Sequence, residues 1–301
     1  FLKAIFLVFD MPKLLKRKWH QRKLQKINQK LLTVLAELLM GNKRRSITLI
    51  NKLVPDLDDD NKEVVNLIMA EAEEGFDKKI QYLRNLLDKK HYSIYAAKKL
   101  AEIFYNNMHH KQAEECALKA FNEDDTDTEL MLILIRIYAS LGAWPKLVFI
   151  VSKLQRADSR LLEENSVEIA SFYYAAAKSY LQSGVDDEAL NYLESALELR
   201  PDYVEALNLF TELSINMKNT ASVLKILKAA FSAKPCFDIA RMYIANSRSS
   251  AEAVYGTLAG IAAPAKYPDL FLALAAYLGL IDKISEIKDP KLISYEKPTK
   301  E

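Results

Sequence analysis

A two-helix motif at residues 170–203 constrains the fold of this chain more than any other feature of its sequence. In 170–182 and again in 186–198, apolar side chains recur at i, i+3, i+4 and i+7, which predicts two amphipathic helices. Gly184 gives the backbone freedom that a tight turn needs, and Pro201 ends the second helix because a proline pushes the preceding residue out of the helical region. One such pair cannot bury its apolar face alone, so the motif predicts neighbouring copies of itself.

Copies of the motif recur at about 34 residues, the period of tetratricopeptide repeats. Other copies start at Val204, Thr128 and Ile94, and weaker ones start at Asn61 and Ile27. Four of the seven glycines fall at the same inter-helix position, and small residues recur at three fixed positions: Gly41, Gly75, Gly142 and Gly184, with Ala177, Ala189 and Ala196 in one copy and Ala101, Ala113 and Ala120 in another. An insertion at 156–169 offsets two of the copies, which we expect to extend a helix or a loop. The pattern predicts an all-α fold, a right-handed tetratricopeptide superhelix (α-solenoid) of about six to seven helix pairs over residues 27–287.

Composition agrees with a helical, intracellular protein. Half of the 301 residues are hydrophobic, glycine and proline are few, and no useful run alternates with period two, so we expect no sheet. The two cysteines, Cys116 and Cys236, fall in different copies, which does not suggest a disulfide framework and fits a reducing compartment. No cysteine or histidine spacing suggests a zinc site, and we predict neither metal nor cofactor.

The first 26 residues differ from the rest. Residues 1–53 carry thirteen Lys and Arg against two acidic residues, although the net charge of the whole chain is only +2. FLKAIFLVF at 1–9 is apolar but too short to span a bilayer alone, so we expect it to be the last part of a transmembrane helix whose start is missing. The basic run that follows is a positive-inside signal and places the remainder in the cytoplasm.

In this interpretation residues 1–26 are the end of a membrane segment and a basic juxtamembrane helix. The residues expected at the membrane surface are Lys13, Lys16, Arg17, Lys18, Arg22 and Lys23. Two alternatives remain open: a buried N-terminal helix followed by a solvated basic helix, and a nucleic-acid-binding arm, against which the acidic remainder argues. We therefore predict membrane contact and no nucleic acid.

The acidic stretches, the C-terminal residues and the histidines indicate structural elements rather than a site of chemistry. The acidic stretches at 56–60 and 122–129 predict solvated turns that cap the following helices, because neither has the glycine and spacing of a calcium-binding loop. Residues 264–280 predict a closing helix, and the charged residues 288–301 predict a frayed tail. His109 and His110 lie in an inter-helix turn. No dinucleotide, phosphate-loop, hydrolase or metalloprotease motif is present, so we predict no catalytic residues and no enzymatic activity.

In tetratricopeptide repeats, four positions of each first helix line a groove that binds partners. Tyrosine and charged residues at such positions suit a protein or peptide ligand. We therefore predict a partner-binding groove that contains Tyr95, Lys98, Glu102, Tyr105, Glu129, Arg136, Tyr174, Lys178, Glu205 and Asn208.

The order of these features resembles one family of repeat proteins. The apolar and basic residues 1–26, KLLTVLAELLMGNKRRSITLINK at 30–52, IYASLGAWPKL at 137–147, SYLQSGVDDEALNYLESALELRPDYVEAL at 179–207 and KAAFSAKPCFDIARMYIA at 228–245 carry the likeness. The chain resembles the HemY-type tetratricopeptide proteins of proteobacterial inner membranes, in particular their alphaproteobacterial branch. It departs from them in lacking the expected paired transmembrane helices.

This resemblance implies a membrane-anchored scaffold that faces the cytoplasm and organises the late enzymes of haem synthesis. Ferrochelatase and protoporphyrinogen oxidase are the implied partners. One alternative is a direct haem or porphyrin carrier, which predicts an axial ligand among His91, His109, His110 and Cys116. The other alternative is a cell-envelope assembly adaptor.

Overall fold

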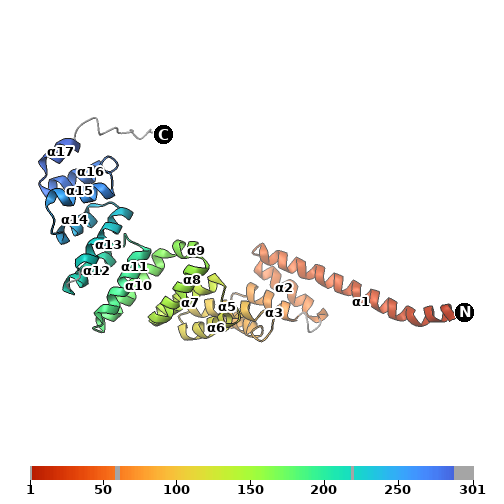
Figure 1. Ribbon diagram of the computed structural model, residues 1–301. Helices are drawn as coiled ribbons and strands as arrows, with labels where there is room; N and C mark the ends of the chain where they lie inside the picture. The colour runs from red at the N-terminus through yellow and green to blue at the C-terminus, as the bar shows by residue number, and fades with distance from the viewer. Residues whose placement is uncertain (1, 58–61, 218–219, 288–301) are drawn as a thin grey trace. The chain divides into compact units, whose positions relative to one another are not determined.

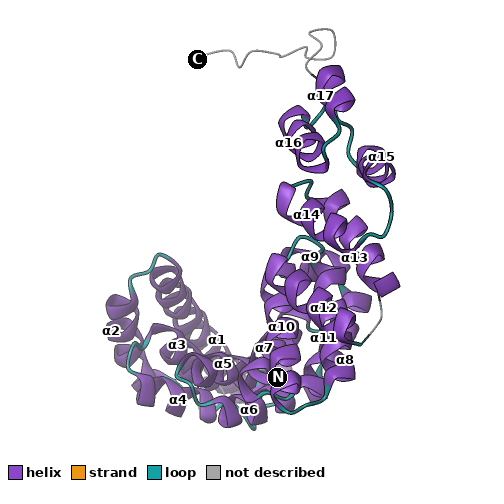
Figure 2. Cartoon of the chain, turned by 90° about the vertical axis from the view of Figure 1, so that its left-hand side faces the viewer, coloured by secondary structure: helices purple, strands orange, loops and turns teal. Residues whose placement is uncertain are grey.

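The computed structural model is built of α-helices. It describes the backbone of residues 2–57, 62–217 and 220–287, and the side chains from residue 21 onward within these ranges except residues 220 and 221. Seventeen α-helices and one short 3₁₀ segment, η1 (Val54–Asp56), account for the regular structure in these ranges, and no strand occurs in them (Figures 1 and 2). The prediction of an all-α tetratricopeptide solenoid is confirmed.

The helices divide between two compact units, residues 1–141 and 142–301. Within unit one, helices pack as the sequential pairs α1–α2, α3–α4 and α5–α6, and α7 packs against α5 and α6. The bounds in unit one are α1 (Leu2–Leu39), α2 (Lys43–Leu53), α3 (Lys62–Ala72), α4 (Phe76–Arg84), α5 (Ser93–Asn106), α6 (His110–Glu123) and α7 (Thr128–Leu141).

Unit two continues the pattern. The pairs α10–α11, α12–α13 and α16–α17 pack together, whereas α14 and α15 each pack against α13 and α16. The bounds in unit two are α8 (Trp144–Ala157), α9 (Ser159–Glu164), α10 (Ser166–Gln182), α11 (Asp186–Leu199), α12 (Val204–Asn216), α13 (Thr220–Ala233), α14 (Phe237–Asn246), α15 (Ala251–Ile261), α16 (Pro268–Leu278) and α17 (Ile281–Ile287).

The insertion at 156–169 extends a helix, as one of the two expectations has it, because α10 begins at Ser166 rather than at Ala170. It also adds a separate short helix, α9, whose N-terminus is capped by the Asp158 carboxylate, which accepts a hydrogen bond from the Leu161 amide. The closing helix predicted at 264–280 is α16, but the chain does not end its regular structure there. Gly279 adopts a left-handed conformation and lets the chain turn into α17. The predicted tail at 288–301 and residues 58–60 of the first acidic loop lie outside the described residues.

The small residues lie where helices cross. Ala101, Ala113 and Ala120 in the α5–α6 pair are fully buried, as are Ala177, Ala189 and Ala196 in the α10–α11 pair. Because a methyl group is the whole side chain, the two helix axes approach closely and larger neighbours fill the remaining space. Small residues at the three recurring positions are therefore buried in both pairs.

The inter-helix turns follow the glycine prediction at three of four positions. Gly41, Gly142 and Gly184 have φ of +80°, +64° and +74°, a left-handed conformation that suits glycine. Gly75 does not, since its φ of −74° and ψ of +123° are extended. In the copy that starts at Ile94, the equivalent residue is Met108, which adopts a φ of +63°. A non-glycine residue in this conformation costs about 1–2 kcal/mol.

The N-terminal helix is longer than one repeat requires. Ile27, Leu31 and Val34 of α1 belong to a buried cluster with residues of α2 and α3, whereas Figure 1 shows the preceding half of α1 extending away from them. One helix therefore runs without interruption across the predicted boundary at residue 26, and that boundary stays a prediction. Among the described residues, no helix is both long enough and apolar enough to cross a membrane.

Candidate partner-binding surface

The predicted groove residues of unit one lie on the first helices of two successive repeats, α5 and α7, and one of them contacts α3 of the preceding repeat. From α5, the Tyr95 hydroxyl donates a hydrogen bond to the Glu71 carboxylate on α3. Burial, and then the hydrogen bond to Glu71, raise the pKa of the Tyr95 hydroxyl above its usual value. The tyrosine therefore stays neutral and links two repeats.

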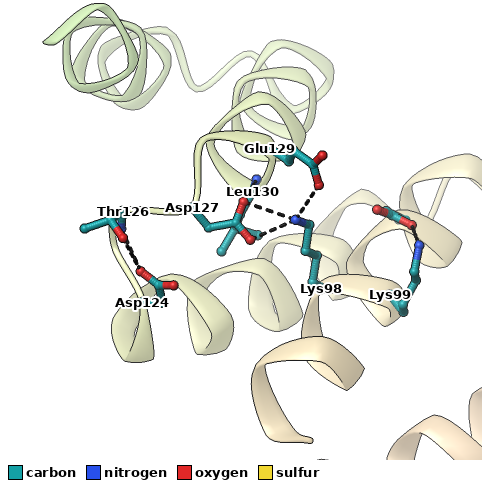
Figure 3. A network of polar contacts seen from close by, with 8 residues as sticks. Lys98, Lys99, Asp124, Thr126, Asp127, Glu129 and Leu130 are labelled. Carbon is teal, nitrogen blue, oxygen red and sulfur yellow. Dashed lines mark hydrogen bonds and ion pairs between the residues drawn. The ribbon is translucent and has the colours of Figure 1, made fainter. Parts of the chain in front are cut away.

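Three residues further along α5, Lys98 reaches the next repeat (Figure 3). Its Nζ lies 2.8 Å from Asp127 Oδ2 and 2.8 Å from Glu129 Oε2. Burial acts against the charged form and is the largest single effect, but hydrogen bonds to the two carboxylates outweigh it and raise the pKa of the Lys98 ammonium. Because the Lys98 side chain is only 18% exposed, this contact is better shielded from solvent than an ordinary surface ion pair.

Asp127 has a second role at the start of α7. Its Oδ1 accepts a hydrogen bond from the Leu130 amide at 3.0 Å, and Asp124 in the same turn accepts hydrogen bonds from the Thr126 amide and hydroxyl. The interpretation of residues 122–129 as a capping turn is confirmed. The turn also supplies the carboxylate that holds Lys98 in place.

The acid dependence of stability should reveal the Asp127 contact. Burial would raise the pKa of Asp127, but the hydrogen bonds from Lys98 and Leu130 prevail and hold it below its usual value. A depressed carboxyl pKa stabilises the fold above about pH 4 and loses this contribution as the pH falls through the folded-state value. We expect Asp127→Asn, which keeps the cap acceptor but not the charge, to be less stable than wild type at pH 7.

This difference should shrink as the pH falls below about 4, because wild-type Asp127 then becomes neutral too. Urea denaturation of both proteins at a series of pH values measures it. A stability difference that stays constant down to the acid transition would contradict the proposed charge contact.

The remaining predicted residues of unit one lie on the same helices but make separate contacts. Glu102 pairs with Lys99 one turn away on α5, at 2.9 Å. The Tyr105 ring lies 5.6 Å from the ring of His110. Arg136 is partly buried on α7. The structure thus links Tyr95, Lys98 and Glu129 to neighbouring repeats, whereas Glu102, Tyr105 and Arg136 make other contacts; the charge of Glu102 also acts on Tyr95.

In unit two, the predicted residues come from α10 and α12. The Tyr174 ring packs against Tyr203 at 5.4 Å, and Lys178 Nζ lies 5.7 Å from the centre of the Tyr174 ring. Glu205 and Asn208 are exposed on α12. Partner binding by the residues of either unit stays a prediction.

Three contact residues escaped the sequence interpretation: Glu71, Asp127 and Tyr203. Asp127 was counted only as a cap in an acidic turn. Glu71 belongs to one of the weaker copies of the repeat, in which the register of the first helix is hard to read. Tyr203 follows Pro201 in a loop, and no periodicity marks such a residue.

The structure describes the predicted membrane-surface residues only in part. Arg22 and Lys23 are exposed on α1, and Lys13, Lys16, Arg17 and Lys18 lie on the same helix, with their side chains outside the described part.

In the described residues, no group of three or more His, Cys, Asp and Glu side chains is arranged for a metal ion. Burial, together with the charge of Glu115, raises the pKa of the Cys116 thiol, which makes it less reactive than a free thiol.

Helix pairs that repeat at about 34 residues, with alanines buried at their crossings, define a tetratricopeptide-repeat solenoid. Proteins of this class present extended surfaces to their partners. No protein-family profile matches the chain. An uncharacterized protein of Rickettsia prowazekii (strain Madrid E) is 29% identical over 284 residues, which cover 93% of this chain and 83% of that protein.

Three of the solved structures that match the chain do so at low sequence identity. The crystal structure of MamA matches with a TM-score of 0.41 and 16% identity over 57% of this chain and 91% of that chain. Pseudomonas aeruginosa PilF matches with a TM-score of 0.33 and 13% identity over 88% and 90%. A structure of Naa15/Naa10 bound to HypK matches with a TM-score of 0.46 and 15% identity over 94% and 48%.

Proposed function

We propose that the protein is a scaffold that binds another protein along the first helices of unit one. The observation that carries this proposal is the chain of contacts from Glu71 through α5 to Asp127 and Glu129. These contacts fix the side chains of three repeats before a partner arrives. A surface that is already ordered loses less conformational entropy on binding.

The chemistry of this surface suits a protein segment. Tyrosines at 95 and 105 offer apolar contact area with one polar tip each, and such residues are enriched among the anchors of protein interfaces. The Glu129 carboxylate, whose side chain is 78% exposed, offers a negative charge on this surface, whereas Lys98 is paired with it and with Asp127. This surface is therefore complementary to a partner segment that carries both apolar and charged side chains.

We further propose that the protein is anchored at the bacterial inner membrane through its N-terminal residues, with its repeats facing the cytoplasm. The dense Lys and Arg of residues 13–26 support this, since each basic residue near an anionic leaflet contributes about 1 kcal/mol. The resemblance to HemY-type proteins supports a role in organising late haem synthesis. In this role the protein carries no redox step itself and holds ferrochelatase or protoporphyrinogen oxidase.

The test is a pull-down of the membrane-anchored protein from a detergent extract, with bound proteins identified by mass spectrometry. We expect ferrochelatase or the oxidase to be recovered, and to be reduced roughly tenfold or more by loss of the central anchors. The variant carries alanine at Tyr95, Lys98, Tyr105 and Arg136.

The matched control carries alanine at Gln155 and Arg156, which are exposed on α8. Its recovery of partners should equal that of wild type. Recovery of envelope-assembly proteins without any haem enzyme would overturn the haem role. Equal recovery by wild type and the four-residue variant would show that the partner does not bind along the first helices of unit one.

A further inference from the structure

A second concave site lies in unit one, away from the surface described above. A cavity of about 560 Å³ lies between one face of α4 and the turn that joins α5 to α6. Phe76 and Ile80 of α4, Phe104 of α5 and His109 of the turn form its apolar part. The His109 ring lies between the two phenylalanines, 6.4 Å from Phe76 and 6.3 Å edge-on from Phe104. A cavity of this volume accommodates several side chains of a ligand.

The turn beside this cavity is strained. Met108 occupies the position where other repeats have glycine, adopts a left-handed φ of +63°, and leaves its side chain 75% exposed. A glycine or an asparagine would adopt this backbone at lower cost. Met108 does not itself line the cavity, but it places an exposed apolar side chain one residue before His109 at a cost in stability, and exposed methionines are common on surfaces that bind varied partners. Phe76, at 37% exposed, adds a second apolar side chain to the rim.

The two ends of the cavity carry opposite charges. Asp77 lies in the first turn of α4 and Arg84 in its last turn, so the two are about 10 Å apart along the helix axis. Both line the cavity, and neither side chain makes a hydrogen bond or an ion pair with another described residue, although the charge of Arg84 acts on the Cys116 thiol. Gln81, which lies between them on α4, and Gln112 of α6 also line the cavity, and their side-chain amides can pair with a peptide backbone. An extended peptide covers the distance from Asp77 to Arg84 in about three to four residues, and a spacing of four keeps the two charged side chains on the same face.

We propose that this cavity docks a short extended segment of a partner protein in which an aromatic or aliphatic residue lies between a basic and an acidic side chain. The apolar anchor enters between Phe76, Phe104 and His109. The basic side chain faces Asp77, and the carboxylate pairs with the Arg84 guanidinium, which binds carboxylates through two parallel hydrogen bonds. This site lies beyond the proposed first-helix surface and does not depend on it.

The test uses the whole chain and two fluorescein-labelled peptides. One peptide carries a phenylalanine with a lysine two residues before it and a glutamate two residues after it, so that all three side chains lie on one face of the extended chain, and the other carries the same phenylalanine with the two charges exchanged. Fluorescence anisotropy should show that wild type binds one peptide at least tenfold more tightly than the other. The double variant Asp77→Lys, Arg84→Glu should reverse this preference, because it exchanges the charges of the two ends.

Two further variants separate this site from the other surface. Lys98→Ala should leave peptide binding unchanged. Met108→Gly should raise the Tm by about 1–3 °C while weakening peptide binding severalfold, and Met108→Asn should do the same. Equal binding of both peptides by wild type and the charge-exchanged variant would overturn the proposal. Loss of binding in Lys98→Ala alone would also overturn it, because it would place the peptide on the first-helix surface.

Discussion

Replacement of Phe210 by alanine should destabilise unit two by about 3–5 kcal/mol, the cost of emptying a large site in a packed core. Phe210 is among the largest fully buried side chains and lies on α12, which packs against both α11 and α13. Solenoid repeats contact mainly their neighbours, so one void weakens the interfaces on both sides of α12.

The control is Phe149→Ala on α8. Phe149 is 64% exposed, and surface changes of this kind usually alter stability by no more than about 0.5 kcal/mol. Urea denaturation followed by the helical circular dichroism signal measures both variants. Equal midpoints for the two variants would show that Phe210 is not a core residue of the protein in solution.

Replacement of Ala177 by leucine should cost about 1–3 kcal/mol through overpacking, although leucine forms helices nearly as well as alanine. Ala177 is fully buried on α10, and the α10–α11 pair encloses it together with Ala189 and Ala196. A leucine there has to push the two helices apart or take an unfavourable rotamer.

Ala175→Leu is the matched control, since Ala175 is exposed on the same helix two residues away. It should leave the denaturation midpoint near that of wild type. If the two leucine variants lose equal stability, helix propensity rather than close helix crossing decides the effect, and the role assigned to the small residues is wrong.

The sequence was sufficient to predict the helix pairs because the same local chemistry recurs in each copy. The alanines at helix crossings and the glycines at turns act over a few residues, and periodicity reveals such positions directly. The backbone conformation at Gly75 could not be predicted from the presence of a glycine. It is extended, and any residue can adopt an extended conformation. Met108 could have been recognised as unusual, since alignment of the copies places it where the others have glycine.

The candidate surface was harder to predict than the fold. The side chain of Lys98 was placed on the first helix correctly, but its partners depend on how far α7 lies from α5, and sequence spacing does not give this distance. Asp127 precedes α7 by one residue and is held by both its cap and Lys98. The cavity beside α4 was missed for a similar reason, because Asp77, Arg84 and His109 come together only when two repeats pack.

The length of α1 has a mechanical consequence. Its residues before Ile27 correspond to about 37 Å of helix at 1.5 Å per residue. A continuous helix transmits rotation and tilt, unlike a flexible glycine-rich linker, which transmits only distance. If the N-terminal end of α1 is bound to another structure, the orientation of that end therefore also determines the orientation of the α1–α2 pair. A rotation or tilt at one end of the helix is transmitted to the other.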